Sequence, residues 1–267
     1  MTESSFFTEL AAWLETPPGR YMLEWEQQQL DHAVADLFGF HALQLGLPQL
    51  DALRANRMPH RWRSGEGEGL DAPSTPGGKP LNKGIALHCD FDALPFPSQS
   101  VDLVVLPHAL ELASDPHQTL REVERVLVPE GRAVILGFNP ASLWGLSQRM
   151  GRMRQRLGGR VPLFLPRTGE FIGYWRLRDW LRLLSFEVER GRFGCYRPGV
   201  RTQRWLDRFQ WIEPTGERWW PVFGAVYFVV AVKRVRGMRL VGLRRKDALK
   251  SKPAPAVVAN SHRESMK

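Results

Sequence analysis

The chain has 267 residues, 43% of them hydrophobic, which is enough for one large domain with a sizeable core. Its two cysteines, Cys89 and Cys195, lie far apart and in no metal-like spacing, so the sequence predicts neither a disulfide framework nor a bound metal. The longest apolar run, residues 221–232, falls short of the ~20 residues that cross a bilayer, and no signal peptide is evident. These features predict a cytoplasmic protein without a transmembrane segment.

The formal net charge of +9 is unevenly distributed along the chain. Residues 1–148 hold 10 basic and 19 acidic side chains, whereas residues 149–208 hold 15 basic and 5 acidic ones. The segment from residue 233 onward adds 11 basic and 2 acidic side chains. The acidic part suits a cationic ligand and the basic parts suit an anionic partner; the alternative is that the arginines only lie solvated on exposed faces.

The first part of the chain alternates helical and strand-like patterns. Apolar residues at helical spacing predict helices over 5–15 and about 20–37, separated by prolines and a glycine. Residues 38–46 predict the first strand and its exit, and Pro48 suits the first position of a helix over about 48–56. A short second strand is expected at residues 61–63.

The centre of the organisation is the stretch from Cys89 to Leu106. A strand is expected to end at Asp90, and two prolines, Pro95 and Pro97, forbid a helix in the following loop. Residues 101–106 form a near-continuous apolar run, which is typical of a strand buried on both faces in the middle of a parallel sheet.

Later segments continue the pattern. Asp115, followed by a proline, is a clean N-cap for a helix that runs to about Leu127. Further strands are expected over 133–136, 186–190 and 225–232, and the last two are separated by a long segment rich in Arg and Trp.

The same stretch carries a resemblance to a known family. An acid ending a strand, then Leu-Pro-Phe-Pro and Val-Asp-Leu-Val-Val, followed by Leu110-Glu111, Asp115-Pro116 and Pro129-Glu130-Gly131, resembles the type 11 branch of class I S-adenosylmethionine (SAM)-dependent methyltransferases. The resemblance is strong over residues 85–139, weaker over 36–84 and slight beyond 150. It implies an α/β Rossmann-like fold with a mainly parallel sheet, helices on both faces and an antiparallel edge strand.

This resemblance divides the chain into three parts. The domain with the methyltransferase-like pattern is expected over 39–235, preceded by two N-terminal helices and followed by a basic disordered tail. Within it lie a flexible loop rich in Gly, Pro and Ser and a basic insertion region rich in Arg and Trp. The N-terminal helices cover 1–38 and the tail covers 236–267. The flexible loop covers 64–84, and the insertion region covers 145–220.

The resemblance also implies a cofactor site. Asp90 would accept a hydrogen bond from the adenine amino group, Phe91 would pack beside the ring, and the strand end at Leu106 and Pro107 would line the pocket. The family's glycine-rich first motif is eroded, because only Gly46 stands at the expected place to give the methionine part of SAM steric clearance.

Three further roles are left open by the sequence. His108 could take a proton from an acceptor, or it could bind a backbone carbonyl as a structural residue. Glu66 and Glu68 are candidates to hold the ribose hydroxyls, although glutamates in such a loop are more often solvated. Asn139 could orient an acceptor or cap the next helix.

The predicted function is SAM-dependent methyl transfer to an unidentified acceptor, which could be a small molecule, a lipid or a nucleic acid. The alternative is a catalytically silent methyltransferase-like module that binds nucleic acid or another anionic partner. In that case the basic segment 149–160 and the basic tail would make the contacts.

Overall fold

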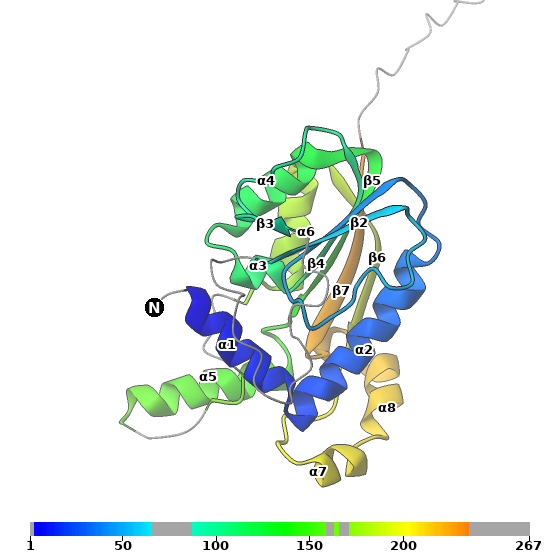
Figure 1. Cartoon of the computed structure of the whole chain (residues 1–267). Helices are drawn as coiled ribbons and strands as arrows, with labels where there is room; N and C mark the ends of the chain where they lie inside the picture. Colours follow the sequence, from blue (N-terminus) through cyan, green and yellow to red (C-terminus); the bar gives the residue numbers. More distant parts are fainter. Residues whose placement is uncertain (1–2, 66–86, 159–162, 166–170, 235–267) are drawn as a thin grey trace, which may run out of the picture. The chain divides into compact units, whose positions relative to one another are not determined.

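A seven-stranded sheet with the strand order β3-β2-β1-β4-β5-β7-β6 forms the centre of the computed structural model of this chain (Figure 1). The structure describes residues 3–65, 87–158, 163–165 and 171–234. They belong to one unit, Met1–Val235. Most of the predicted 64–84 loop and all of the predicted tail therefore lie outside the described residues.

The sheet is parallel except at one strand. Strands β1 to β5 pair in parallel, and β7 runs antiparallel between β5 and the edge strand β6. This arrangement confirms the predicted Rossmann-like fold and the predicted pairing of the last two strands. The strands are β1 (His41–Leu45), β2 (His60–Gly65), β3 (Leu87–His88), β4 (Val101–Pro107), β5 (Leu127–Phe138), β6 (Phe186–Gly194) and β7 (Val226–Lys233).

The apolar run predicted for the middle of the sheet is β4. It has three strands on either side in the strand order, and all but one of its residues are buried. Its exception, Asp102, accepts hydrogen bonds from the backbone N–H groups of Phe40 and His41, each at 2.9 Å, and so fixes the start of β1 against β4. Burial on both faces is typical of a central strand in a parallel sheet with helices on both sides.

Helices cover both faces of the sheet. Figure 1 shows α4 and α6 on one side and α2 on the other, as the resemblance implied. No helix within the described ranges is long and apolar enough to cross a membrane. The helices are α1 (Glu3–Leu14), α2 (Pro17–Val34), α3 (Ala109–Leu112), α4 (Pro116–Val126), α5 (Leu143–Arg156), α6 (Tyr174–Leu183), α7 (Gln203–Arg208) and α8 (Ile212–Trp219), with a 3-10 turn η1 (Pro221–Phe223).

The prediction of a helix over 48–56 is wrong, because this segment folds into consecutive turns. The buried amide of Gln44 replaces the helical hydrogen bonds. Its nitrogen donates to the carbonyls of Leu47 (3.2 Å) and Leu50 (2.7 Å), and its oxygen accepts from the N–H of Ala52 (3.0 Å). A side chain that occupies these backbone groups leaves them unavailable for a helix.

The start of β5 also differs from the sequence prediction. Strand β5 begins at Leu127 instead of residue 133, and its pairing with β4 shifts register between Val101 and Leu103. The extra residues include the predicted turn at Pro129-Glu130-Gly131, where Glu130 has a positive φ of 63°. The turn therefore lies within the irregular start of a longer strand. By contrast, the predicted cap of α4 is confirmed, since Asp115 accepts from the N–H groups of His117 and Gln118.

Candidate active site

The carboxyl ends of β1 and β4 meet at one edge of the sheet. Gly46 follows β1 with φ of +82°, and its N–H donates to the carbonyl of Ser64 at the end of β2 (3.2 Å). A Cβ at Gly46 would lie 3.2 Å from both the carbonyl oxygen of Pro107 and the Cβ of Ala109. Glycine is required here by the left-handed backbone and by the close approach to β4. The structure thus brings together Gly46 and Pro107, two of the predicted site residues.

The other predicted cofactor residues differ in exposure. Leu106 and Phe91 are completely buried in the core, whereas Asp90 is exposed two residues beyond the end of β3. The carboxylate of Asp90 is therefore exposed near the carboxyl end of a parallel strand, and its hydrogen bond to an adenine amino group stays a prediction. The full burial of Phe91 shows a packing role; its predicted place beside an adenine ring stays a prediction.

His108 occupies the first position after β4, with a left-handed φ of 54°, and its imidazole is completely buried. Its Nε2 lies 2.7 Å from Glu26 Oε1 on α2, and its Nδ1 lies 2.8 Å from Glu111 Oε2 on α3. Both ring nitrogens therefore face carboxylates. We call His108, Glu26 and Glu111 the buried triad.

The triad stabilises the charged form of the imidazole. Burial is the largest single influence and opposes the charge, but the two carboxylates together outweigh it and raise the pKa of His108 from 6.5 to about 10. At neutral pH the ring is an imidazolium that donates both of its N–H groups and has no lone pair to accept a further proton. This geometry does not suit the predicted role of His108 as a proton acceptor.

The triad also holds the end of β5. Glu111 Oε1 accepts from the backbone N–H of Phe138 at 2.5 Å. A Cβ at Gly137 would collide with the hydroxyl of Tyr227, so glycine lets this tyrosine pack against the same strand end. Burial, together with the nearby charge of Glu111, raises the pKa of Tyr227 well above its usual value. The network therefore joins α2, α3, β4 and β5 in one buried polar cluster.

The sequence analysis did not identify Glu26 as a site residue, although the pattern of α2 indicates that this glutamate is buried. The buried face of α2 carries Met22, Glu26, Leu30 and Val34 at intervals of four residues. A glutamate in line with three apolar residues breaks the amphipathic pattern and indicates a buried partner. Its second oxygen, Oε2, is buried without a hydrogen-bond partner within the described part of the chain.

The side chain of Asn139 links the end of β5 to the backbone of residues 222–224, and it does not cap the next helix. Its amide nitrogen donates to the carbonyls of Val222 (2.7 Å) and Gly224 (2.9 Å), and its oxygen accepts from the N–H of Ala141 (3.1 Å). The cap of α5 is Ser142 instead. The two other open candidates, Glu66 and Glu68, lie outside the described residues.

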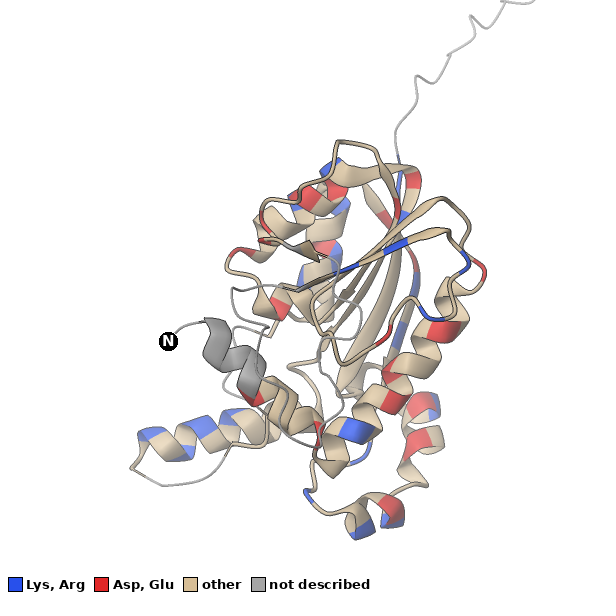
Figure 2. Cartoon of the chain, in the orientation of Figure 1, with Lys and Arg blue, Asp and Glu red and all other residues tan. Residues whose placement is uncertain are grey.

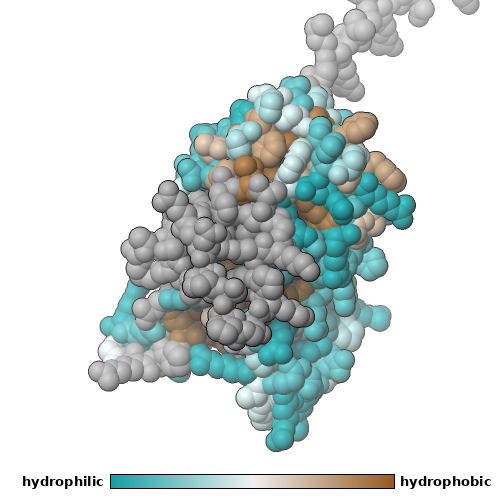
Figure 3. Space-filling model, viewed as in Figure 1, coloured by the Kyte–Doolittle hydropathy of each residue, from teal (hydrophilic) through white to brown (hydrophobic). Residues whose placement is uncertain are grey.

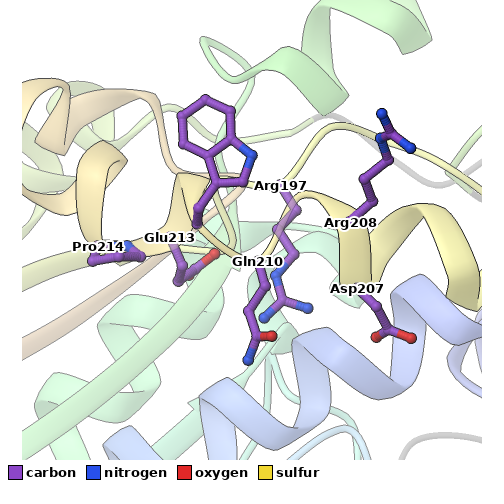
Figure 4. A pocket seen from close by; sticks show the side chains of 7 residues that line it. Arg197, Asp207, Arg208, Gln210, Glu213 and Pro214 are labelled. Atoms are coloured by element: carbon purple, nitrogen blue, oxygen red, sulfur yellow. The ribbon is translucent and has the colours of Figure 1, made fainter.

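A separate hollow of about 690 Å³ lies within the predicted insertion region, over α7 and α8 (Figure 4). Arg197 points into it, with its guanidinium 4.3 Å from the ring centre of Tyr21, and its buried Nε lacks a hydrogen-bond partner among the described residues. The carboxylate of Glu213 accepts hydrogen bonds from the hydroxyl of Tyr21 and from the backbone N–H groups of Cys195 and Tyr196. The lining residues are Arg197, Asp207, Arg208, Gln210, Trp211, Glu213 and Pro214. The wall of the hollow therefore carries side chains of both charges.

Parts of this chain are similar in sequence to a known protein family and to known proteins. Residues 76–135 match a family model described as "Methyltransferase domain". A curated relative, the uncharacterized protein YafS of Escherichia coli K12, is 32% identical over 178 residues, which cover 66% of this chain and 65% of YafS. The chain therefore spans just under two thirds of the length of this relative. A demethylmenaquinone methyltransferase of Chlamydia pneumoniae is 39% identical, over 20% of this chain and 24% of its own.

Two solved structures share the fold. One is a chain from the complex between the Haloferax volcanii Trm112 methyltransferase activator and a methyltransferase, with a TM-score of 0.52, 19% identity and coverage of 87% of this chain and 99% of that one. The other is a SAM-dependent methyltransferase from Thermotoga maritima, with a TM-score of 0.53, 16% identity and coverage of 86% and 97%. At these identities the likeness shows the fold alone.

Proposed function

We propose that this chain transfers a methyl group from SAM to an acceptor, because residues 76–135 match a methyltransferase domain and the fold is that of a SAM-dependent methyltransferase. The observation that carries the proposal is the meeting of Gly46 with Pro107 and Ala109. Strands β1 and β4 are neighbours in the sheet but not in the sequence, so the strand order reverses between them. Open α/β sheets bind their ligands at this point, outside the carboxyl ends of the strands.

In this proposal Gly46 lies at the methionine end of SAM and Asp90 at its adenine end. Gly46 is buried at the end of β1, and any side chain there would meet β4. Asp90 offers an exposed carboxylate that can accept a hydrogen bond from an amino group. When bound, SAM supplies a methyl group on a sulfonium, which is a good leaving group for an in-line displacement. Much of the rate can then come from positioning of the two reactants.

In this proposal His108 is a positioning residue and not the base. Its two N–H groups are taken by Glu26 and Glu111, which fixes the peptide immediately after Pro107. A proton released by the acceptor would leave through solvent or through a group on the acceptor itself. The triad keeps the edge of the crevice rigid, and rigid placement of reacting groups is the contribution that this chemistry needs.

The acceptor is not identified by relatives. The demethylmenaquinone methyltransferase of Chlamydia pneumoniae matches only 20% of this chain, and the longer relative, YafS, has no described activity in its name. The acceptor class is therefore left to experiment. Purified protein with methyl-labelled SAM should transfer label to one of three fractions: small molecules, lipids or nucleic acids.

A calorimetric titration of SAM into the full-length protein tests the proposal. We expect wild type to bind SAM or S-adenosylhomocysteine and Asp90→Ala to bind much more weakly, because the variant loses its acceptor for the adenine amino group. Asp36→Ala is the matched control: it removes an exposed acid from the turn after α2 and should bind like wild type. Absence of binding to wild type at millimolar ligand would end the enzymatic proposal, and equal affinities of wild type and Asp90→Ala would end the assignment of Asp90.

A further inference from the structure

Helix α5 has a buried face that fixes its orientation. The indole nitrogen of Trp144 donates to the carbonyl of Arg197 (2.8 Å). The side chain of Gln148 exchanges two hydrogen bonds with the backbone of Leu165, each at 3.0 Å. Trp144 and Gln148 are each only 1% exposed. The helix is thus anchored along one side and cannot turn its opposite side toward the core.

The opposite side carries an apolar stripe. Large apolar side chains recur at alternating intervals of three and four residues, and each keeps more than half of its surface exposed. At 3.6 residues per turn they fall within an arc of about 80°. Single exposed apolar residues are normal, but a continuous row marks an interaction surface. The stripe consists of Leu143 (56% exposed), Leu146 (53%), Met150 (51%), Met153 (66%) and Leu157 (79%).

Arginines border this stripe on both sides. At the same helical spacing Arg154 lies along one border, and Arg149 and Arg156 lie along the other. Arg152 is turned toward the ring of Phe171, 5.8 Å away. Helix α5 contains no acidic residue, and Figure 2 shows it banded in blue alone. In Figure 3 hydrophobic and hydrophilic side chains lie next to one another over this helix.

We infer that α5 docks on an anionic lipid surface. An apolar stripe between arginine borders is the pattern of a helix that lies in the plane of a membrane interface. The leucines and methionines would enter the boundary of the acyl chains, while the arginines extend along their own aliphatic stems to the phosphates. This role does not depend on methyl transfer, so it is tested independently of the proposed function.

Charge decides between a lipid surface and a second copy of the chain. The three-four spacing would also suit the seam of a coiled coil. Two copies of α5 would, however, bring arginine borders against arginine borders with no acidic residue on either helix to pair with them. Like charges across an interface are unfavourable, whereas phosphate headgroups supply the missing negative charge.

Co-sedimentation with vesicles tests the inference on the full-length protein. We expect wild type to bind vesicles of phosphatidylcholine with phosphatidylglycerol better than vesicles of phosphatidylcholine alone. Met150→Gln/Met153→Gln should lower the partition into the anionic vesicles by roughly tenfold or more, because two apolar side chains no longer enter the interface. Both residues are exposed, so the variant should melt at the temperature of wild type.

The matched control is Phe38→Gln/Leu183→Gln, which removes two exposed apolar side chains outside α5 and should partition like wild type. All three proteins keep the basic residues of 236–267, so these residues cannot cause a difference between them. Equal partition of wild type and Met150→Gln/Met153→Gln would overturn the inference. So would a wild-type dimer in analytical ultracentrifugation that the α5 variant dissociates, since the stripe would then belong to a second copy.

Discussion

Replacing all three members of the buried triad by glutamine removes the buried imidazole together with both of its carboxylate partners. In Glu26→Gln/His108→Gln/Glu111→Gln every group is neutral and of similar size, and the new amide at position 111 keeps an oxygen to accept from the N–H of Phe138. The stability difference between wild type and this variant then reports how the triad responds to pH. Tyr227 and Cys195 are kept in both proteins, but the variant removes the charges of Glu111 and Glu26, which help to raise their pKa values.

The direction of the response follows from the raised pKa. The pKa of His108 moves from 6.5 in the unfolded chain to about 10 in the fold, so between these values only the folded state holds the proton. The stabilisation is fully present below pH 6.5 and is lost as the pH rises through about 10. At 1.36 kcal/mol per pKa unit, the shift corresponds to at most about 5 kcal/mol, with a slope of about 1.4 kcal/mol per pH unit.

Urea unfolding of both proteins between neutral pH and the pKa of His108 measures this slope. We expect the free energy of unfolding of wild type to fall relative to the triple variant as the pH rises, while the difference stays flat in mildly acidic buffer. Nuclear magnetic resonance of the ring nitrogens gives an independent reading, because an imidazolium should persist well above pH 7. A pH-independent stability difference, or a ring that titrates near its ordinary pKa, would refute the charged triad.

Two further substitutions test local structure by urea unfolding. Gln44→Leu should lower the free energy of unfolding by about 1–3 kcal/mol, because the buried backbone groups of the turns after β1 lose their hydrogen-bond partner. Gln210→Leu replaces an exposed glutamine and should change the free energy of unfolding little. Equal effects of the two substitutions would contradict this account. Asp115→Ala should cost about 1 kcal/mol, because the first turn of α4 loses its cap, whereas Asp115→Ser should retain most of that stability. An Asp115→Ser variant as unstable as Asp115→Ala would contradict the capping role.

The parts of the fold that the sequence predicted well have local causes. The burial of β4 follows from its own apolar run, and the start of α4 follows from Asp115 and the proline after it. Asp90 was expected to end a strand, and it lies two residues beyond the end of β3. Each of these signals lies within a few residues of the feature that it predicts.

The parts that the sequence did not predict depend on contacts between distant residues. His108 and Glu26 are 82 positions apart, so nothing near His108 indicates that a carboxylate will occupy its Nε2. The turns after β1 depend on whether the side chain of Gln44 is buried, and burial is set by the packing of the whole sheet. A proline at the start of a polar-apolar segment favours a helix only when no side chain competes for the same backbone groups.

The erosion of the glycine-rich motif is compatible with this geometry. Gly46 is the position at which a side chain would meet β4. The next residue, Leu47, adopts a φ of 23° without being glycine, and the hydrogen bond from Gln44 to its carbonyl holds it there. On the facing strand the triad fixes the residue after Pro107. Buried polar side chains therefore hold both strand ends: Gln44 holds the turn after β1, and the triad holds the residue after Pro107.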